Sequence, residues 1–92
     1  MALQISENNG TFELKGKLTS TTTRSFMNHF KFVMNTMKNI TVNIDQVETI
    51  DMNGVEALKT LITMALKSNK KFSVIGYGCK DIYDDYKTSM VA

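Results

Sequence analysis

The chain has 92 residues, which is enough for one domain around one core and too short for a second independent domain. Its 11 basic and 9 acidic residues give a formal net charge of +2, too weak a bias to indicate nucleic-acid binding. One cysteine excludes an internal disulfide, no apolar run approaches the roughly 20 residues of a membrane span, and the N-terminus lacks the pattern of a secretory leader. We therefore expect a single domain over residues 1–92, located in the cytoplasm.

The first predicted element is a β-hairpin. Apolar and polar residues alternate on both sides of Asn9-Gly10, a pair typical of two-residue hairpin turns. The apolar positions of this alternation are Leu3, Ile5, Phe12, Leu14 and Leu18. We expect two antiparallel strands, the second with one face in water.

A helix is predicted next, because the apolar period lengthens to that of one helical face. Its apolar residues are Phe26, Phe30, Val33, Met34 and Met37. The hydroxyl cluster of residues 19–23 supplies candidate N-caps for this helix.

Three further elements follow in the pattern. ITVNID, residues 40–45, alternates again, which indicates a strand in a sheet with one largely open face. Helical spacing then returns at Val55, Leu58, Leu61, Ile62, Ala65 and Leu66. Asn69 is a typical helix stop, and KFSVIGYG, from residue 71, is expected to form a short strand. KDIYDDYKTSM, residues 80–90, has helical spacing in Ile82, Tyr83, Tyr86 and Met90.

The order β-β-α-β-α-β-α predicts a small α/β domain. Each strand-helix-strand passage joins two parallel strands, and the hairpin adds an antiparallel edge. We expect a mixed, mainly parallel four-stranded sheet with the helices packed mainly on one face. The predicted core residues are Phe26, Phe30, Val33, Val42, Ile44, Leu58, Leu61, Ile62 and Val74.

Four segments together resemble the STAS domain, a family named for sulphate transporters and anti-sigma-factor antagonists. They are ELKGKLTSTTT, ITVNIDQVETID, DMNGVEAL and KKFSVIGYG, and the resemblance covers nearly the whole chain. It implies a small α/β domain that binds partner proteins. For the bacterial antagonist branch, it implies that a serine or threonine before a glycine is phosphorylated by a partner kinase that is also the anti-sigma factor.

Asn53 occupies the position that matches this phosphoacceptor. By the same resemblance, Asp51 matches the acidic residue of the motif, Met52 its variable neighbour and Gly54 its glycine. A carboxamide has no hydroxyl to accept a phosphoryl group, so we expect no phosphorylation at this degenerate position. The side chain stays neutral, and the chain is expected to resemble the unphosphorylated state permanently.

The same residues also have a purely structural interpretation. In this alternative, Asp51 or Asn53 caps the following helix, and Asn53 with Glu56 forms a variant of the capping box. Gly54 either allows a second backbone to approach closely or is simply tolerated at a helix start. The functional interpretation adds that free amides at a helix start favour an anion, which suits a phosphoserine in relatives.

The resemblance implies a regulatory domain that binds a protein. We expect it to be non-enzymatic, since no nucleophile, base and orienting group can be combined from these residues. By resemblance, the partner is an anti-sigma factor of the histidine-kinase-like ATPase type or another signalling protein. The expected contact residues are Ser20, Thr21, Thr22, Thr23, Asp51, Met52, Asn53, Gly54, Glu56 and Lys59. Two alternatives remain open: a subunit of a lipid-transport ATPase complex, and a module that binds a small ligand such as a nucleotide.

No cofactor and no metal are expected. His29 lies beside an apolar helix face and has no second ligand at metal-binding spacing. Cys79 lacks a catalytic partner, and the adjacent Asp84 and Asp85 point to different sides of a helix.

Overall fold

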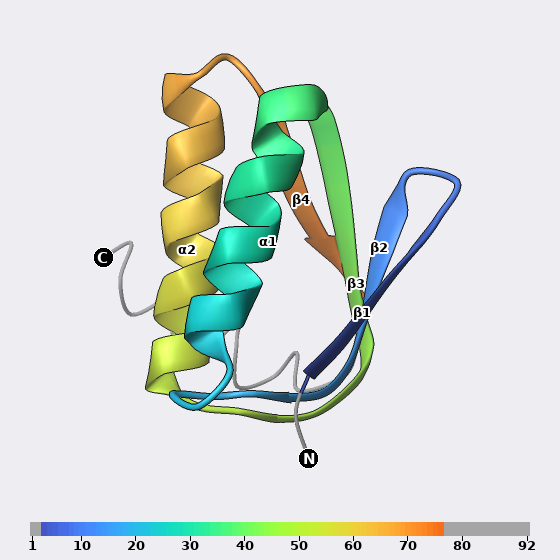
Figure 1. Ribbon diagram of the computed structural model, residues 1–92, viewed down its shortest axis with the longest axis vertical. Coiled ribbons are helices and arrows are strands. Elements are labelled where there is room, and N and C mark those ends of the chain that lie inside the picture. Colours follow the sequence, from blue (N-terminus) through green and yellow to red (C-terminus); the bar gives the residue numbers. More distant parts are fainter. Residues whose placement is uncertain (1–2, 77–92) are drawn as a thin grey trace.

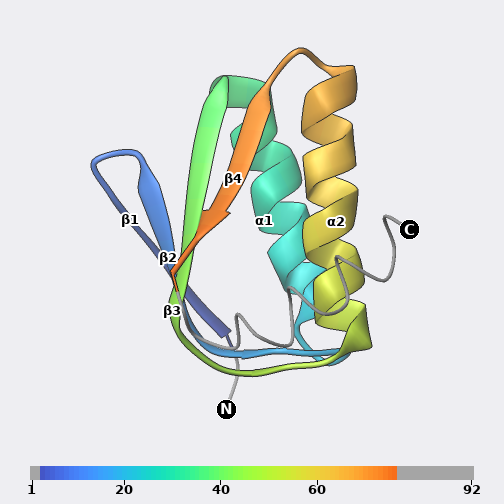
Figure 2. The ribbon, with the colours of Figure 1, turned by 180° about the vertical axis from the view of Figure 1, so that it is seen from behind.

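The computed structural model describes residues 3–76. Its elements are β1 (Leu3–Asn8), β2 (Thr11–Leu18), α1 (Thr23–Thr36), β3 (Asn39–Ile50), α2 (Met52–Lys67) and β4 (Lys71–Ile75). Both helices lie on the same side of the sheet, as the two opposite views show (Figures 1 and 2). This arrangement confirms the predicted α/β fold. The helix predicted over residues 80–90 and Cys79 lie outside the described residues.

The four strands stand in the order β1-β2-β3-β4. β1 pairs antiparallel with β2, whereas β2–β3 and β3–β4 pair in parallel, so the mixed sheet is as predicted. Asn9 and Gly10, which connect β1 to β2, have φ angles of 55° and 86°. Two consecutive residues with positive φ favour the tight hairpin turn that the Asn-Gly pair predicts.

β3 is longer than the alternation predicts, because the strand continues from Asp45 to Ile50. Glu13 and Lys15 of β2 pair with Asn43 and Gln46, so β3 gains one residue there, and a second register shift follows between Gly16 and Lys17. Each bulge moves the next side chain to the other face. As a result Ile44, Val47 and Ile50 are all buried although they are three residues apart. This spacing does not have the period of two by which strands are recognised.

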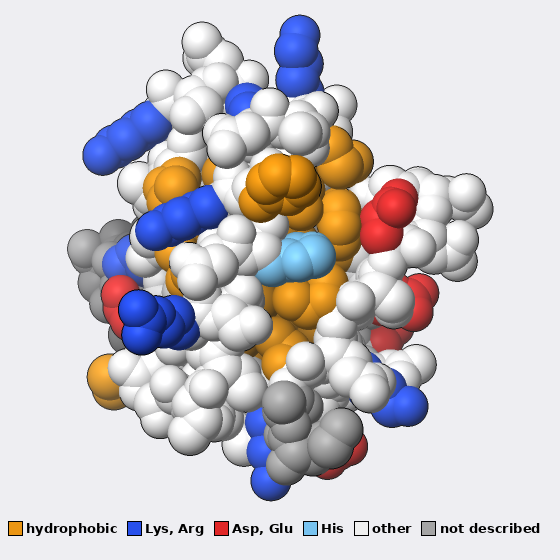
Figure 3. Space-filling view, in the orientation of Figure 1, with side chains coloured by type: hydrophobic (Ala, Val, Ile, Leu, Met, Phe, Trp, Pro, Cys, Tyr) orange, Lys and Arg blue, Asp and Glu red, His pale blue; other side chains and the backbone are white. Residues whose placement is uncertain are grey.

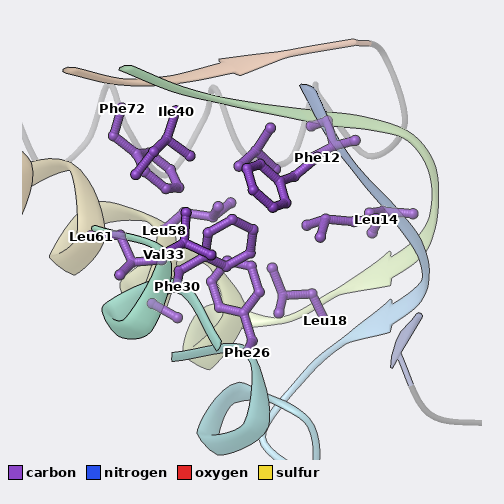
Figure 4. Close-up of a cluster of buried hydrophobic side chains, with 14 of the residues drawn as sticks. Phe12, Leu14, Leu18, Phe26, Phe30, Val33, Ile40, Leu58, Leu61 and Phe72 are labelled. Carbon is purple, nitrogen blue, oxygen red and sulfur yellow. The ribbon is translucent and has the colours of Figure 1, made fainter. Parts of the chain in front are cut away.

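The core lies between the inner face of the sheet and the two helices (Figure 4). Phe26 and Phe30 of α1 and Leu58 and Leu61 of α2 are completely buried in it. Phe30 also contacts Phe72 of β4 edge to face, with 5.8 Å between the ring centroids. Of the predicted core residues, Ile62 and Val74 are only partly buried, and the others are buried.

Leu66 is a correction to the predicted apolar face of α2, since 71% of its surface is exposed. The buried positions Leu58, Leu61 and Ala65 define the inner face, and Leu66 is rotated by about 100° from Ala65. Asn69 ends the helix as predicted: it has a φ of 57°, and the Lys70 N–H donates to the Ala65 carbonyl at 2.7 Å.

The helices leave part of the sheet uncovered near its β1 edge. Figure 3 shows hydrophobic side chains at the surface in a hollow between α1 and the β1–β2 hairpin. His29 is exposed on α1 and contacts the rings of Phe12 and Phe30 edge to face. This is the environment of a half-packed surface histidine.

Candidate functional site

The candidate site lies where β2 and β3 end side by side and the chain turns into α1 and α2 (Figure 1). Leu18 and Ile50 are register partners, and the Asp51 N–H donates to the Leu18 carbonyl at 3.3 Å. The two connections, from β2 to α1 and from β3 to α2, therefore leave the sheet side by side at the carboxyl ends of these strands. In parallel α/β sheets, this end of the strands is where binding sites are usually built.

Asp51 joins the two connections. It is the N-cap of α2, and its Oδ1 accepts a hydrogen bond from the Gly54 N–H at 2.9 Å. Its Oδ2 accepts the Ser20 N–H at 3.1 Å, across 31 residues of sequence. Of the two predicted cap candidates, Asp51 is the N-cap, and Asn53 lies within the first turn of α2.

These hydrogen bonds stabilise the charged form of Asp51. Partial burial alone raises the pKa of Asp51, but the N–H groups of Gly54 and Ser20, together with Asn53, stabilise the carboxylate more. The pKa of Asp51 therefore lies below its ordinary value. Since both carboxylate oxygens accept backbone N–H groups, the negative charge is used inside the protein to hold the two helix starts together.

Gly54 is required by a close backbone contact. A Cβ atom at this position would overlap the Leu18 carbonyl oxygen and would lie 2.9 Å from Cγ1 of Ile50. Gly54 is buried, and its backbone conformation is an ordinary helical one. Of the two predicted explanations for this glycine, the structure supports the close approach of a second backbone.

In the hydroxyl cluster of residues 19–23, one residue is buried and the others are at least partly exposed. Thr22 is only 7% exposed, its hydroxyl donates to the Lys17 carbonyl at 2.8 Å, and the same oxygen accepts the Thr19 N–H at 3.0 Å. Thr22 occupies the N-cap position of α1, but its side chain makes no capping hydrogen bond to the helix. It therefore fixes the connection instead of capping α1.

We call the predicted contact residues together the helix-start surface. Eight of them reach the surface at least partly: Ser20, Thr21, Thr23, Asp51, Met52, Asn53, Glu56 and Lys59. Met52 is a large hydrophobic residue that is 59% exposed, and Asn53 next to it is also exposed. The other two, Thr22 and Gly54, are buried and act as the framework that holds these side chains.

A shallow, open depression on the outer face of α2 adjoins this surface. It has a volume of about 270 Å³, and its lining residues are Glu56, Lys59, Thr60, Thr63, Met64 and Lys67. Sequence reasoning named only Glu56 and Lys59 of these. The recurrence of residues 56, 60, 63 and 67 at helical spacing was the signal for the rest.

Two further kinds of site, a metal site and a membrane-spanning helix, were sought among the described residues. Within residues 3–76, no three His, Cys, Asp or Glu side chains come together as possible metal ligands. Neither α1 nor α2 is long and apolar enough to cross a membrane.

Comparison with known structures agrees with this geometry. The anti-sigma-factor antagonist SpoIIAA in its unphosphorylated form matches with a TM-score of 0.65 and 10% identity, over 89% of this chain and 81% of that chain. A protein of the DUF3478 family from Shewanella loihica PV-4, described as having a SpoIIAA-like fold, matches with a TM-score of 0.55 and 16% identity, over 83% of this chain and 66% of that chain. At these identities the matches show a shared fold.

A larger protein, described as Mglu, contains a similar unit. It matches with a TM-score of 0.65 and 10% identity over 80% of this chain, which spans only 19% of the length of Mglu. No curated protein sequence matches this chain. The model of the STAS domain matches residues 1–80. The chain therefore belongs to the STAS domain family.

Proposed function

We propose that this STAS domain is a non-enzymatic regulatory module of the cytoplasm that binds a protein through the helix-start surface. The observation that carries the proposal is the exposed, uncharged pair Met52 and Asn53 in the first turn of α2. Asp51 holds this turn against the connection to α1 through its two hydrogen bonds. The pair is thus presented on a fixed backbone, which lowers the entropy lost on binding.

The neutral side chain of Asn53 sets the state of the surface. In our proposal it stands where the family's antagonists carry a hydroxyl that is phosphorylated. A partner that binds the unphosphorylated form would meet an amide of similar polarity, and no phosphate could repel it. Met52 would supply an adaptable apolar contact beside this amide. Glu56 and Lys59, both exposed on the next turns of α2, would steer the encounter more than they would add affinity.

The partner that fits this proposal is a histidine-kinase-like ATPase that acts as an anti-sigma factor. The shared fold with SpoIIAA, itself described as an anti-sigma-factor antagonist, supports this choice. The first test is recovery of partners from the native cell with the tagged domain as bait, followed by binding of each purified partner. Direct binding of a kinase-like anti-sigma factor would support the proposal. Binding of a transporter ATPase would favour a lipid-transport subunit, and binding of a nucleotide alone would favour a ligand module.

The absence of a phosphoacceptor gives a second test. The domain is incubated with the recovered kinase and ATP, and phosphorylated peptides are identified by mass spectrometry. We expect no phosphate on the wild-type turn, whereas Asn53→Ser should be phosphorylated at the new hydroxyl. Stoichiometric phosphate on Ser20 or Thr49 of the wild type would contradict the proposal and show that the switch lies at another position.

A further inference from the structure

The chain contains two Asn-Gly pairs, Asn9-Gly10 and Asn53-Gly54. In both, the N–H of the glycine donates to a carboxylate three residues earlier. The Gly10 N–H donates to Oε2 of Glu7, and the Gly54 N–H donates to Oδ1 of Asp51, each at 2.9 Å. The same bond thus holds the same nitrogen at two unrelated places in the fold.

That nitrogen is the nucleophile of asparagine deamidation. The glycine nitrogen loses its proton and attacks Cγ of the asparagine, and the side-chain amide nitrogen leaves as ammonia. A five-membered succinimide results, and water then opens it at either carbonyl to give aspartate or isoaspartate. The net reaction consumes one water and releases one ammonia. Glycine favours it because it has no side chain to hinder the approach.

We propose that Asn53 is a deamidation site whose rate is limited by the hydrogen bond between Asp51 and the Gly54 N–H. The product would place a permanent negative charge at the exposed position that, in the proposed function, stands in place of the phosphoacceptor. Asn53 would then act as a slow, one-way switch from the neutral to the charged state. The chemistry stands on the structure alone, and only its effect on binding rests on the proposed function.

The two Asn-Gly pairs differ in how well the structure protects them from deamidation. Gly10 lies in a surface turn where a Cβ atom would meet nothing within 4 Å, and its bond to Glu7 is exposed. Gly54 is buried against the Leu18 carbonyl and its N–H is bonded to Asp51 at the start of the helix, so we expect attack on Asn53 Cγ to require opening of the first turn of α2. Both nitrogens must also break a hydrogen bond to a carboxylate, which slows the step at both sites, so the difference in rate comes from the burial of Gly54 in the helix. Asn9 should therefore convert faster than Asn53.

Conversion of Asn53 would also weaken the bond that protects it. Asn53 is one of the groups that lower the pKa of Asp51 by stabilising its carboxylate. A carboxylate at position 53 would replace this donor by a like charge next to Asp51. Isoaspartate would add one backbone carbon directly before Gly54, whose backbone lies in close contact with Leu18. The converted turn is thus expected to be more open than the original one.

The rates are measured by incubating the folded and the denatured chain at mildly alkaline pH and following both peptides by mass spectrometry. In the denatured chain Asn9 and Asn53 should convert at similar rates. In the folded chain Asn53 should convert measurably but more slowly than Asn9, because Gly54 is buried in the first turn of α2 whereas Gly10 lies in an open surface turn. Equal rates at the two sites of the folded chain, or no conversion at Asn53 even in the denatured chain, would overturn the proposal. This comparison needs no variant, so it holds even where a variant does not fold.

Two matched variants isolate the hydrogen bonds. Asp51→Ala should accelerate conversion at Asn53 several-fold and leave Asn9 unchanged, whereas Glu7→Ala should accelerate only Asn9. An unchanged rate at Asn53 in a folded Asp51→Ala protein would refute the protective role of Asp51. In an Asn9→Gln variant, protein converted at Asn53 is then separated by its added negative charge and titrated against the purified partner, with Asn9→Asp as the control. Conversion without loss of affinity would leave the deamidation site standing and would refute the proposed binding surface.

Discussion

Replacing Gly54 by alanine places a methyl group where the start of α2 lies against the end of β2. This methyl would overlap the Leu18 carbonyl oxygen and come within 2.9 Å of Cγ1 of Ile50. The carbonyl cannot move freely, because it also accepts the Asp51 N–H at 3.3 Å. The backbones of the two connections must therefore separate.

The size of the effect follows from three contributions. Overpacking of a tight site costs about 1–3 kcal/mol of unfolding free energy. Weakening of the bond between Asp51 and Leu18 adds about 0.5–1.5 kcal/mol. The better helix propensity of alanine offsets up to about 1 kcal/mol. We expect Gly54→Ala to lower the free energy of unfolding by about 0.5–4.5 kcal/mol, a large fraction of the stability of so small a domain.

Urea unfolding followed by circular dichroism measures this difference. Asn53→Ala is the matched control, since it adds no atoms against β2 and lies in the same turn on the exposed side. Its free energy of unfolding should fall by less than that of Gly54→Ala, because only the stabilisation of the Asp51 carboxylate by the Asn53 side chain is lost. A Gly54→Ala protein as stable as the wild type would show that α2 does not begin in contact with Leu18.

Two further predictions concern the core and the cap. Leu61→Ala should lower the free energy of unfolding by about 2–5 kcal/mol, because Leu61 is completely buried. Leu66→Ala, at an exposed position of the same helix, is the control. Equal stability of the two variants would contradict the core assignment. Because the pKa of Asp51 is lowered in the folded state, its contribution to stability is present above the ordinary aspartate pKa of about 3.9 and is lost as the pH falls through the folded pKa. Thermal melts over a pH series should therefore show a shallower acid-side decline for Asp51→Ala, and identical slopes for both proteins would refute the stabilising role of this carboxylate.

Local sequence patterns predicted most of the fold, because most elements follow one apolar period. The hairpin at Asn9-Gly10 and the stop at Asn69 depend on a few neighbouring residues, and both are confirmed. The length of β3 could not be predicted from local sequence patterns. Its two bulges arise from pairing with β2, which is distant in the sequence, and they change the spacing of Val47 and Ile50.

The sequence predicted where in the fold the candidate site lies, but it did not predict which of its side chains are exposed. The predicted contact residues of the two connections lie together, since the Ser20 N–H donates to the Asp51 carboxylate. Burial of Thr22 could not be inferred, since threonine is mostly an exposed residue, and for Gly54 the sequence left a close backbone contact and a merely tolerated glycine both open. The double role of Asp51 depends on a backbone N–H from another connection, which no local motif records.

Isothermal titration of the recovered partner with Asn53→Asp tests the central claim most directly. Asn53→Asp barely changes the size of the side chain, and the helix dipole should tolerate the new charge within roughly 0.3–1 kcal/mol, so the fold should survive. An unpaired or repelled carboxylate at the interface should lower affinity by about tenfold to a thousandfold. Asn9→Asp makes the same change at the hairpin turn, at the other end of β2, and should bind like the wild type. Unchanged affinity of a folded Asn53→Asp protein would contradict the account and leave Asn53 without a role in partner binding.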